Sequence, residues 1–105
     1  LVETHFSCVS PGTESRVVAG RQSGAPAFPF IPGYAASGRV VAAGPGVGLA
    51  PGENVFFSGT ERADVALCWG AHVSHAVVSA RNLSLIPAGV DLRSASSAKL
   101  AAIAY

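Results

Sequence analysis

The stretch IPGYAASGRVVAAGPGVGLAPGENV, residues 31–55, decides the fold, because it alternates short apolar runs with turn-forming residues. Residues 33–41 and 54–57 predict two strands, each rich in apolar side chains. Residues 44–48 and 51–52 predict turns before the second strand, since glycine and proline favour the backbone angles of tight turns. Short strands separated by such turns predict a mainly β domain of barrel form.

Upstream of this stretch, residues 1–8 place alternate side chains on opposite faces, which predicts a half-buried strand. The segment Ser10-Pro11-Gly12 predicts a turn. Thr13 is expected to cap a short helix over residues 14–19, with Gly20 at its far end. A long proline-containing loop then follows.

Downstream, residues 59–70 predict a loop, and residues 71–78 and 83–86 predict two further strands. Asp91 is expected to cap a helix over residues 92–105, which is rich in alanine and contains no glycine or proline. A strand already under way at the first residue and a helix unfinished at the last indicate a fragment of a longer protein.

The composition limits the classes of function. A chain of 105 residues fits one domain. Its seven basic and six acidic residues are scattered and form no stripe of positive charge, so nucleic-acid binding is not expected. No uninterrupted apolar stretch is long enough for a spanning helix, so no membrane partner is expected. Cys8 and Cys68 are too few for a disulfide framework. Two free thiols are favoured over a single bridge, and a cytoplasmic protein is expected.

Several short motifs occur along the chain in a fixed order. They are SPGTE (10–14), IPG (31–33), GRVV (38–41), GPGV (44–47), PGENV (51–55), GAH (70–72) and PAGV (87–90). In this order they resemble the N-terminal, GroES-like domain of the medium-chain dehydrogenase/reductase superfamily, over nearly the whole chain. The resemblance implies one domain, residues 1–105, with a GroES-like, partly open β-barrel, short helices and a C-terminal helix. It also implies that the first strand and a Rossmann cofactor domain lie outside the fragment.

The resemblance implies that the usual zinc ligands are absent. Where zinc-containing members have a cysteine, a histidine and a glutamate, this chain has Pro11, Tyr34 and Ala35. The region that carries four cysteines for a structural zinc in such members holds only Cys68. We therefore expect no metal ligands and a member of the zinc-independent branch.

A different metal site built from Cys68, His72 and His75 is not favoured. In a strand, His72 and His75 would point to opposite faces, and Cys68 is separated from both. One inward and one solvated histidine are expected instead. His5 is equally remote in sequence, so spacing suggests no Ser-His-Asp or Cys-His arrangement.

The resemblance implies an NAD(P) cofactor, which would be held by the Rossmann domain of the full-length protein. The glycine-rich segment 44–48 lacks the third glycine of a dinucleotide fingerprint and precedes a strand instead of a helix. It is interpreted as a turn, and no cofactor-binding residue is assigned in this chain.

Two residues are candidates for the catalytic site. Thr13 matches a hydroxyl residue of the proton-relay path in zinc-containing relatives, and Tyr34 places a phenol at a ligand position. Either could hydrogen-bond a substrate oxygen or protonate it. The alternatives are a capping role for Thr13 and simple volume filling by Tyr34. Glu14 is interpreted as a partner of the helix dipole.

These expectations favour the substrate-side domain of a zinc-independent oxidoreductase that acts on a small molecule with a carbonyl, an alcohol or a conjugated double bond. The chain alone is not expected to catalyse the reaction. The alternative is a non-enzymatic GroES-like module that binds a small molecule or a partner; a co-chaperonin is a weaker possibility, by analogy of fold alone. Self-association through the first strand edge or the terminal helix is expected.

Overall fold

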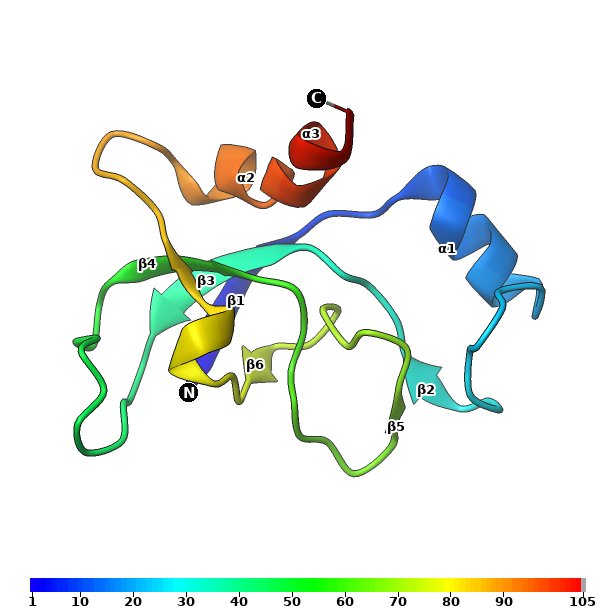
Figure 1. Ribbon diagram of the computed structural model, residues 1–105, viewed down its shortest axis with the longest axis horizontal. Coiled ribbons are helices and arrows are strands. Elements are labelled where there is room, and N and C mark those ends of the chain that lie inside the picture. The colour runs from blue at the N-terminus through cyan, green and yellow to red at the C-terminus, as the bar shows by residue number, and fades with distance from the viewer. Residues whose placement is uncertain (105) are drawn as a thin grey trace.

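A computed structural model of the protein describes residues 1–104. Its main sheet has five strands in the order β6-β1-β3-β4-β7, and all neighbouring strands are antiparallel. The strands are β1 (Val2–Ser7), β3 (Ala36–Val40), β4 (Asn54–Phe57), β6 (His75–Ala76) and β7 (Ser84–Leu85). A second, parallel pair consists of β2 (Phe30–Ile31) and β5 (Ala66–Leu67), which lie side by side below helix α1 in Figure 1.

The sheet is open, with β6 and β7 at its edges, and no pairing between them closes it within residues 1–104. The predicted mainly β, partly open GroES-like architecture is therefore confirmed. The expected free edge of the first strand is partly wrong, because β6 pairs with Val2 and Glu3 of β1. No helix among the described residues combines the length and apolar character needed to cross a bilayer.

The central pairing of β1 with β3 depends on Gly38. Thr4 lies opposite Gly38 in the register, and the ladder is interrupted by a bulge between Thr4 and Phe6. A Cβ atom at residue 38 would lie 2.0 Å from the carbonyl oxygen of Glu3. Only glycine therefore allows the two backbones to approach this closely.

The hydrophobic core lies on one face of this sheet and contains small and medium side chains. Phe57 of β4 is its largest member, and it is fully buried. The buried cluster consists of Val2, Ala36, Val40, Val55, Phe57, Ala71 and Ala76. Because strands β1, β3, β4 and β6 all contribute to it, the cluster fixes their relative positions.

Helix α1 (Pro11–Val18) begins three residues earlier than predicted, so the assignment of Thr13 as its cap is wrong. Ser10 occupies the cap position, and Pro11 starts the helix because its fixed φ and missing N–H suit the first turn. The Glu14 carboxylate accepts the Ser10 N–H at 2.6 Å and replaces a side-chain cap. Gly20 follows the end of the helix as predicted, and its N–H donates to the Val17 carbonyl at 3.1 Å.

The predicted C-terminal helix is divided into α2 (Leu92–Ala95) and α3 (Ala98–Ala104), so a single continuous helix is wrong. The Asp91 carboxylate accepts the Ser94 N–H at 2.8 Å, which confirms the predicted cap. Ser96 and Ser97 separate the helices, and their hydroxyls donate to backbone carbonyls three residues earlier. Such bonds compete with the helical ladder. The predicted end at Tyr105 lies outside the described residues.

Helix α2 packs on the sheet at β3. The buried Ser37 hydroxyl donates a short hydrogen bond to the Leu92 carbonyl, and Leu92 itself is buried. Figure 1 shows α2 and α3 together over the sheet, with α1 at the far end of the molecule. This packing determines where α3 lies relative to the strands.

The predicted strand over residues 71–78 is confined to β6, and the strand over 83–86 to β7. The first strand is shortened because the N–H groups of Ala71 and His72 donate to the carbonyls of Gly33 and Pro32, at 2.9 and 3.1 Å, and not to a neighbouring strand of the main sheet. The predicted loop 59–70 contains the short strand β5, and a 3-10 helix, η1 (Ala80–Asn82), was not predicted.

The contact at Gly38 predicts the effect of adding one methyl group. In Gly38→Ala, Cβ would meet the Glu3 carbonyl, so we expect the free energy of unfolding to fall by roughly 1–3 kcal/mol. Urea denaturation followed by circular dichroism measures this change. Gly44→Ala is the matched control, since a Cβ atom at residue 44 would have no neighbour within 4 Å. Equal stability of the two variants would contradict the tight β1–β3 approach.

The loop that contains Glu61 is tied to η1 by hydrogen bonds that depend on ionisation. Ser79 N and Ser79 Oγ donate to the Glu61 carboxylate at 2.6 and 2.7 Å, and Asn82 Nδ2 donates at 3.2 Å. These bonds, that of the Ser79 backbone above all, lower the pKa of Glu61 below its ordinary value of 4.5. A lowered folded-state pKa contributes stability above the unfolded-state pKa, and this contribution is lost as the pH falls through the folded-state value.

We therefore expect Glu61→Gln to reduce the acid sensitivity of folding. Its melting temperature should fall less than that of the wild type when the pH is lowered from neutrality to below 4.5. Ser79→Ala, which keeps the backbone donor, should behave in an intermediate way. Thermal melts followed by circular dichroism across this range measure the difference, and parallel curves for all three proteins would refute it.

Candidate functional site

Tyr34, one of the two predicted site residues, lies in an aromatic and cationic cluster. Its side chain is buried at 9% exposure. The Trp69 ring meets it edge-to-face, with centroids 5.2 Å apart. The Lys99 ammonium lies 5.3 Å from the centre of the Tyr34 ring. Tyr34 thus joins the loop before β3, the loop after β5 and helix α3.

The backbone at Trp69 is strained. With φ of 74°, Trp69 is the single non-glycine residue with positive φ among residues 1–104. The opposite loop holds it in place, because Thr60 N donates to the Gly70 carbonyl at 3.0 Å. A Cβ atom at Gly59 would lie only 1.8 Å from the Trp69 carbonyl oxygen. Strain of this kind persists only where the surroundings over-determine it, and it is frequent at binding sites.

A second cluster, Ser7, Glu14 and His72, supports the segment that precedes Tyr34. His72 Nε2 makes a short hydrogen bond with Glu14 Oε1, and His72 Nδ1 lies 2.8 Å from Ser7 Oγ. The imidazole ring occupies the space beside Gly33, where a Cβ atom would lie 2.6 Å from it. Gly33 also has φ of 92°, a conformation that favours glycine.

This Ser-His-Glu cluster was not predicted from the spacing of the residues. His72 lies 58 residues from Glu14 and 65 from Ser7 in the sequence. Both imidazole nitrogens are engaged, and the other Glu14 oxygen accepts the Ser10 N–H. The cluster therefore joins β1, α1 and the loop after β5, and both ring nitrogens take part in holding these segments together. The predicted helix-dipole position of Glu14 agrees with its place in the first turn of α1.

Thr13, the other predicted site residue, lies on α1 and is half-buried. Its hydroxyl accepts a long hydrogen bond of 3.5 Å from Arg16. No hydrogen bond joins Thr13 to Tyr34 within the described part of the chain. Lys99 and Trp69, which do contact Tyr34, were not predicted; an isolated lysine in an alanine-rich helix was the one available signal for Lys99.

The donor chemistry does not fit a zinc ion at the position that the superfamily implies. Pro11 and Ala35 offer no side-chain ligand, and the Tyr34 ring packs against both Trp69 and Lys99. Within residues 1–104, no three histidine, cysteine or acidic side chains group as metal ligands would. Cys68 is buried, which raises the pKa of its thiol and disfavours the thiolate that a metal needs.

The glycine-rich segment 44–48 forms surface turns that lead into β4. No helix follows it, so it presents no helix N-terminus to a pyrophosphate. The interpretation of this segment as a turn is confirmed.

Comparison with known proteins identifies relatives among dehydrogenases. The chain is 40% identical over 62 residues to 2-desacetyl-2-hydroxyethyl bacteriochlorophyllide A dehydrogenase of Cereibacter sphaeroides. The aligned segment covers 57% of this chain and 20% of that protein. The enzyme of the same name from Rhodobacter capsulatus is 38% identical over 61 residues, 56% of this chain and 19% of the relative. The matched part is therefore about one fifth of each relative's length.

No solved structure gives a significant match to the chain. The family model of the alcohol dehydrogenase GroES-like domain matches residues 1–88, most of the sequence. This match agrees with the open antiparallel sheet and with the ordered motifs around residues 10–14 and 31–55. The chain belongs to the alcohol dehydrogenase GroES-like domain family.

Proposed function

We propose that this chain forms the substrate-side wall of a zinc-independent, NAD(P)-dependent oxidoreductase. The observation that carries the proposal is the position of Tyr34. The phenol at the implied ligand position, packed against Trp69 and Lys99, supports a reaction that proceeds without a zinc ion at that position. Pro11 and Ala35, which stand where zinc-containing members have a cysteine and a glutamate, support the same proposal, because neither side chain can bind a metal.

Among alcohol, carbonyl and conjugated double-bond chemistry, we favour the interconversion of an alcohol and a carbonyl group. Both relatives are named as dehydrogenases of a hydroxyethyl-bearing compound. The nicotinamide cofactor supplies hydride chemistry when it is bound. Residues of this chain would bind the substrate oxygen, with Tyr34 or Thr13 as hydrogen-bond donor. The partners proposed are a small-molecule substrate and a Rossmann domain, and neither nucleic acid nor a membrane.

The cofactor is proposed to bind outside this chain. The one glycine-rich candidate, residues 44–48, is a turn that leads to a strand. We therefore propose that residues 1–105 alone do not catalyse the reaction. Cys8 and Cys68 are free thiols, which is compatible with the proposed cytoplasmic location.

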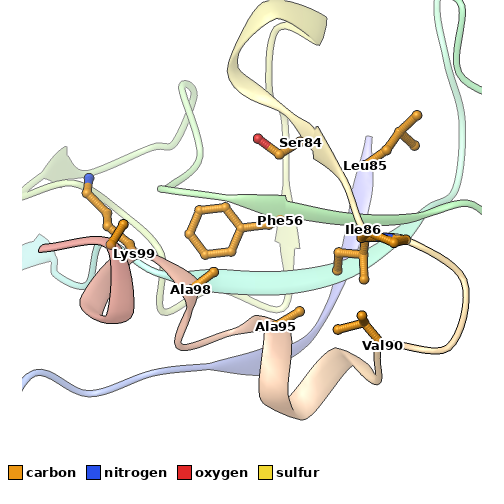
Figure 2. Close-up of a pocket in the computed structure, with 10 residues that line it drawn as sticks. Phe56, Ser84, Leu85, Ile86, Val90, Ala95, Ala98 and Lys99 are labelled. Atoms are coloured by element: carbon orange, nitrogen blue, oxygen red, sulfur yellow. The ribbon is translucent and has the colours of Figure 1, made fainter. Parts of the chain in front are cut away.

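A second candidate function is self-association, and a specific apolar groove favours it. The groove has a volume of about 440 Å³ and lies between the sheet and the last two helices. Figure 2 shows the Phe56 ring facing Ala98 and Ala95, while the Lys99 ammonium points away from it. Leu85 at the groove is 58% exposed, and Ile103 on α3 is 69% exposed. Exposed apolar surface of this kind promotes association.

The proposed zinc-independent chemistry predicts resistance to chelators. In the complete gene product, nicotinamide-dependent turnover should persist after dialysis against a chelator, and elemental analysis should find far less than one zinc ion per chain. A zinc-containing alcohol dehydrogenase treated in parallel should lose its activity. Stoichiometric zinc together with loss of activity on chelation would refute the zinc-independent assignment.

The proposed location of the cofactor predicts a difference between the chain and the complete protein. Isothermal titration of NADH and NADPH into residues 1–105 should give no binding heat, whereas the complete gene product should bind one of them. Binding to the isolated chain would show that the cofactor site lies here.

The apolar groove predicts association that depends on its own side chains. Light scattering at rising protein concentration should show dimers or larger species of residues 1–105. The variant Leu85→Ser should reduce their fraction severalfold, because it removes exposed apolar area. Val18→Ser on α1, which is 77% exposed and remote from the groove, is the control. A monodisperse monomer at every concentration would contradict this candidate.

A further inference from the structure

We propose that Lys99 is a substrate-binding residue, whose ammonium binds the carbonyl or carboxylate oxygen of a planar, apolar molecule that lies against Trp69. This inference rests on the proposed oxidoreductase function and adds to it a cationic group for the substrate oxygen. Three observations carry it: the contacts of Lys99, the exposure and left-handed backbone of Trp69, and a cavity lined by Trp69 and by Ser58, the hydrogen-bond partner of Lys99.

The Lys99 ammonium is held in a defined position by two contacts. It lies over the Tyr34 ring at 5.3 Å, within the range of a cation–π interaction. It also donates a hydrogen bond to Ser58 Oγ at 3.3 Å. No carboxylate forms a salt bridge with it among residues 1–104, where the ion pairs all involve histidines. Within the described residues the ammonium therefore has aromatic and hydroxyl neighbours and no acidic partner.

The Trp69 ring, which meets Tyr34 edge-to-face, is displayed toward solvent. Trp69 is 41% exposed although it is a large aromatic residue, and its backbone adopts the left-handed region. Ser58 and Trp69 line a cavity of about 270 Å³ together with Gly59, Thr60, Glu61 and Asn82. The hydrogen bond from Lys99 to Ser58 therefore joins the ammonium to the wall of this cavity. The space is suited to a ring of small-molecule size.

The acidic residue of the cavity does not neutralise Lys99. Both oxygens of Glu61 are occupied, Oε1 by Ser79 Oγ and Oε2 by Ser79 N and Asn82 Nδ2. Glu61 is thus committed to the 3-10 helix on the other side of the cavity. The two opposite charges have separate roles, because one orders a loop and the other remains available to a substrate.

The chemistry of the proposed reaction needs such a cation. When a carbonyl group accepts a hydride at carbon, negative charge develops on its oxygen, and a preorganised positive group stabilises that charge. Zinc provides this stabilisation in metal-containing relatives. In this chain the ammonium of Lys99 lies next to Tyr34, the residue at the implied ligand position. A planar substrate would stack on Trp69 while its oxygen binds Lys99.

Trp69 provides a direct test, because it is the sole tryptophan of the chain. Sodium benzoate, a planar ring with a carboxylate, is titrated into residues 1–105 while tryptophan fluorescence is recorded. The wild type should show saturable quenching. Lys99→Met, which keeps the apolar stem but removes the charge, should weaken binding about tenfold or more, as expected for loss of a charge-assisted hydrogen bond.

Two variants make the result specific to the ammonium. Lys99→Arg keeps a positive charge and should bind benzoate within about threefold of the wild type, because a charge-assisted hydrogen bond to the carboxylate remains available. Arg93→Met removes an exposed cation from α2, for which the described residues show no cation–π contact with Tyr34, and should bind as the wild type does. Circular dichroism and melting temperatures show that each variant folds. Absence of saturable quenching in the wild type, or equal affinity of wild type and Lys99→Met, would overturn the proposal.

The result of the benzoate titration can be separated from the test of the proposed oxidoreductase function. If benzoate binding fails but the complete gene product shows nicotinamide-dependent turnover, the role of Lys99 is wrong and the oxidoreductase stands. If benzoate binding depends on Lys99 but no nicotinamide-dependent turnover occurs, the binding site stands and the oxidoreductase is wrong.

Discussion

The contact between Gly33 and the His72 ring is the constraint on which the rest of the site depends. The ring fills the space where any other residue would carry its Cβ atom, and the backbone at Gly33 has φ of 92°. Glu14 and Ser7 hold the two ring nitrogens. Three segments that are distant in sequence are thereby fixed around one glycine, and the position of the next residue, Tyr34, follows from this arrangement.

The other half of the site is brought in by the helices. Lys99 lies on α3, whose position follows from the packing of α2 on the sheet. The hydrogen bond from Ser37 to the Leu92 carbonyl fixes α2 on β3. Because Tyr34 lies in the loop that leads directly into β3, the segment next to the anchoring strand carries the ring under the ammonium. The cluster of Tyr34, Trp69 and Lys99 is thus assembled from a loop, a strained turn and helix α3, all positioned relative to β3.

The sequence predicted what local patterns can encode. Alternation identified β1, turn residues identified the approach to β4, and the Asp91 cap was correct. The cap at Thr13 was wrong because Pro11 and Glu14 together offered an earlier start for the helix. The strand over 71–78 failed because its first N–H groups bond to the loop at Gly33, a non-local contact. The Ser-His-Glu cluster and the place of Lys99 are non-local as well, and a spacing argument cannot find them.

The parallel pair β2–β5 gives the proposed substrate wall a particular dynamic character. Each strand has two residues, and the turn at Trp69 follows β5 almost directly. So short a ladder has few hydrogen bonds to lose, and segments of this kind open locally at a free energy far below that of global unfolding. Amide protons near Trp69 would then exchange sooner than those of β3. The wall of the pocket and the core of the sheet would be separate cooperative units.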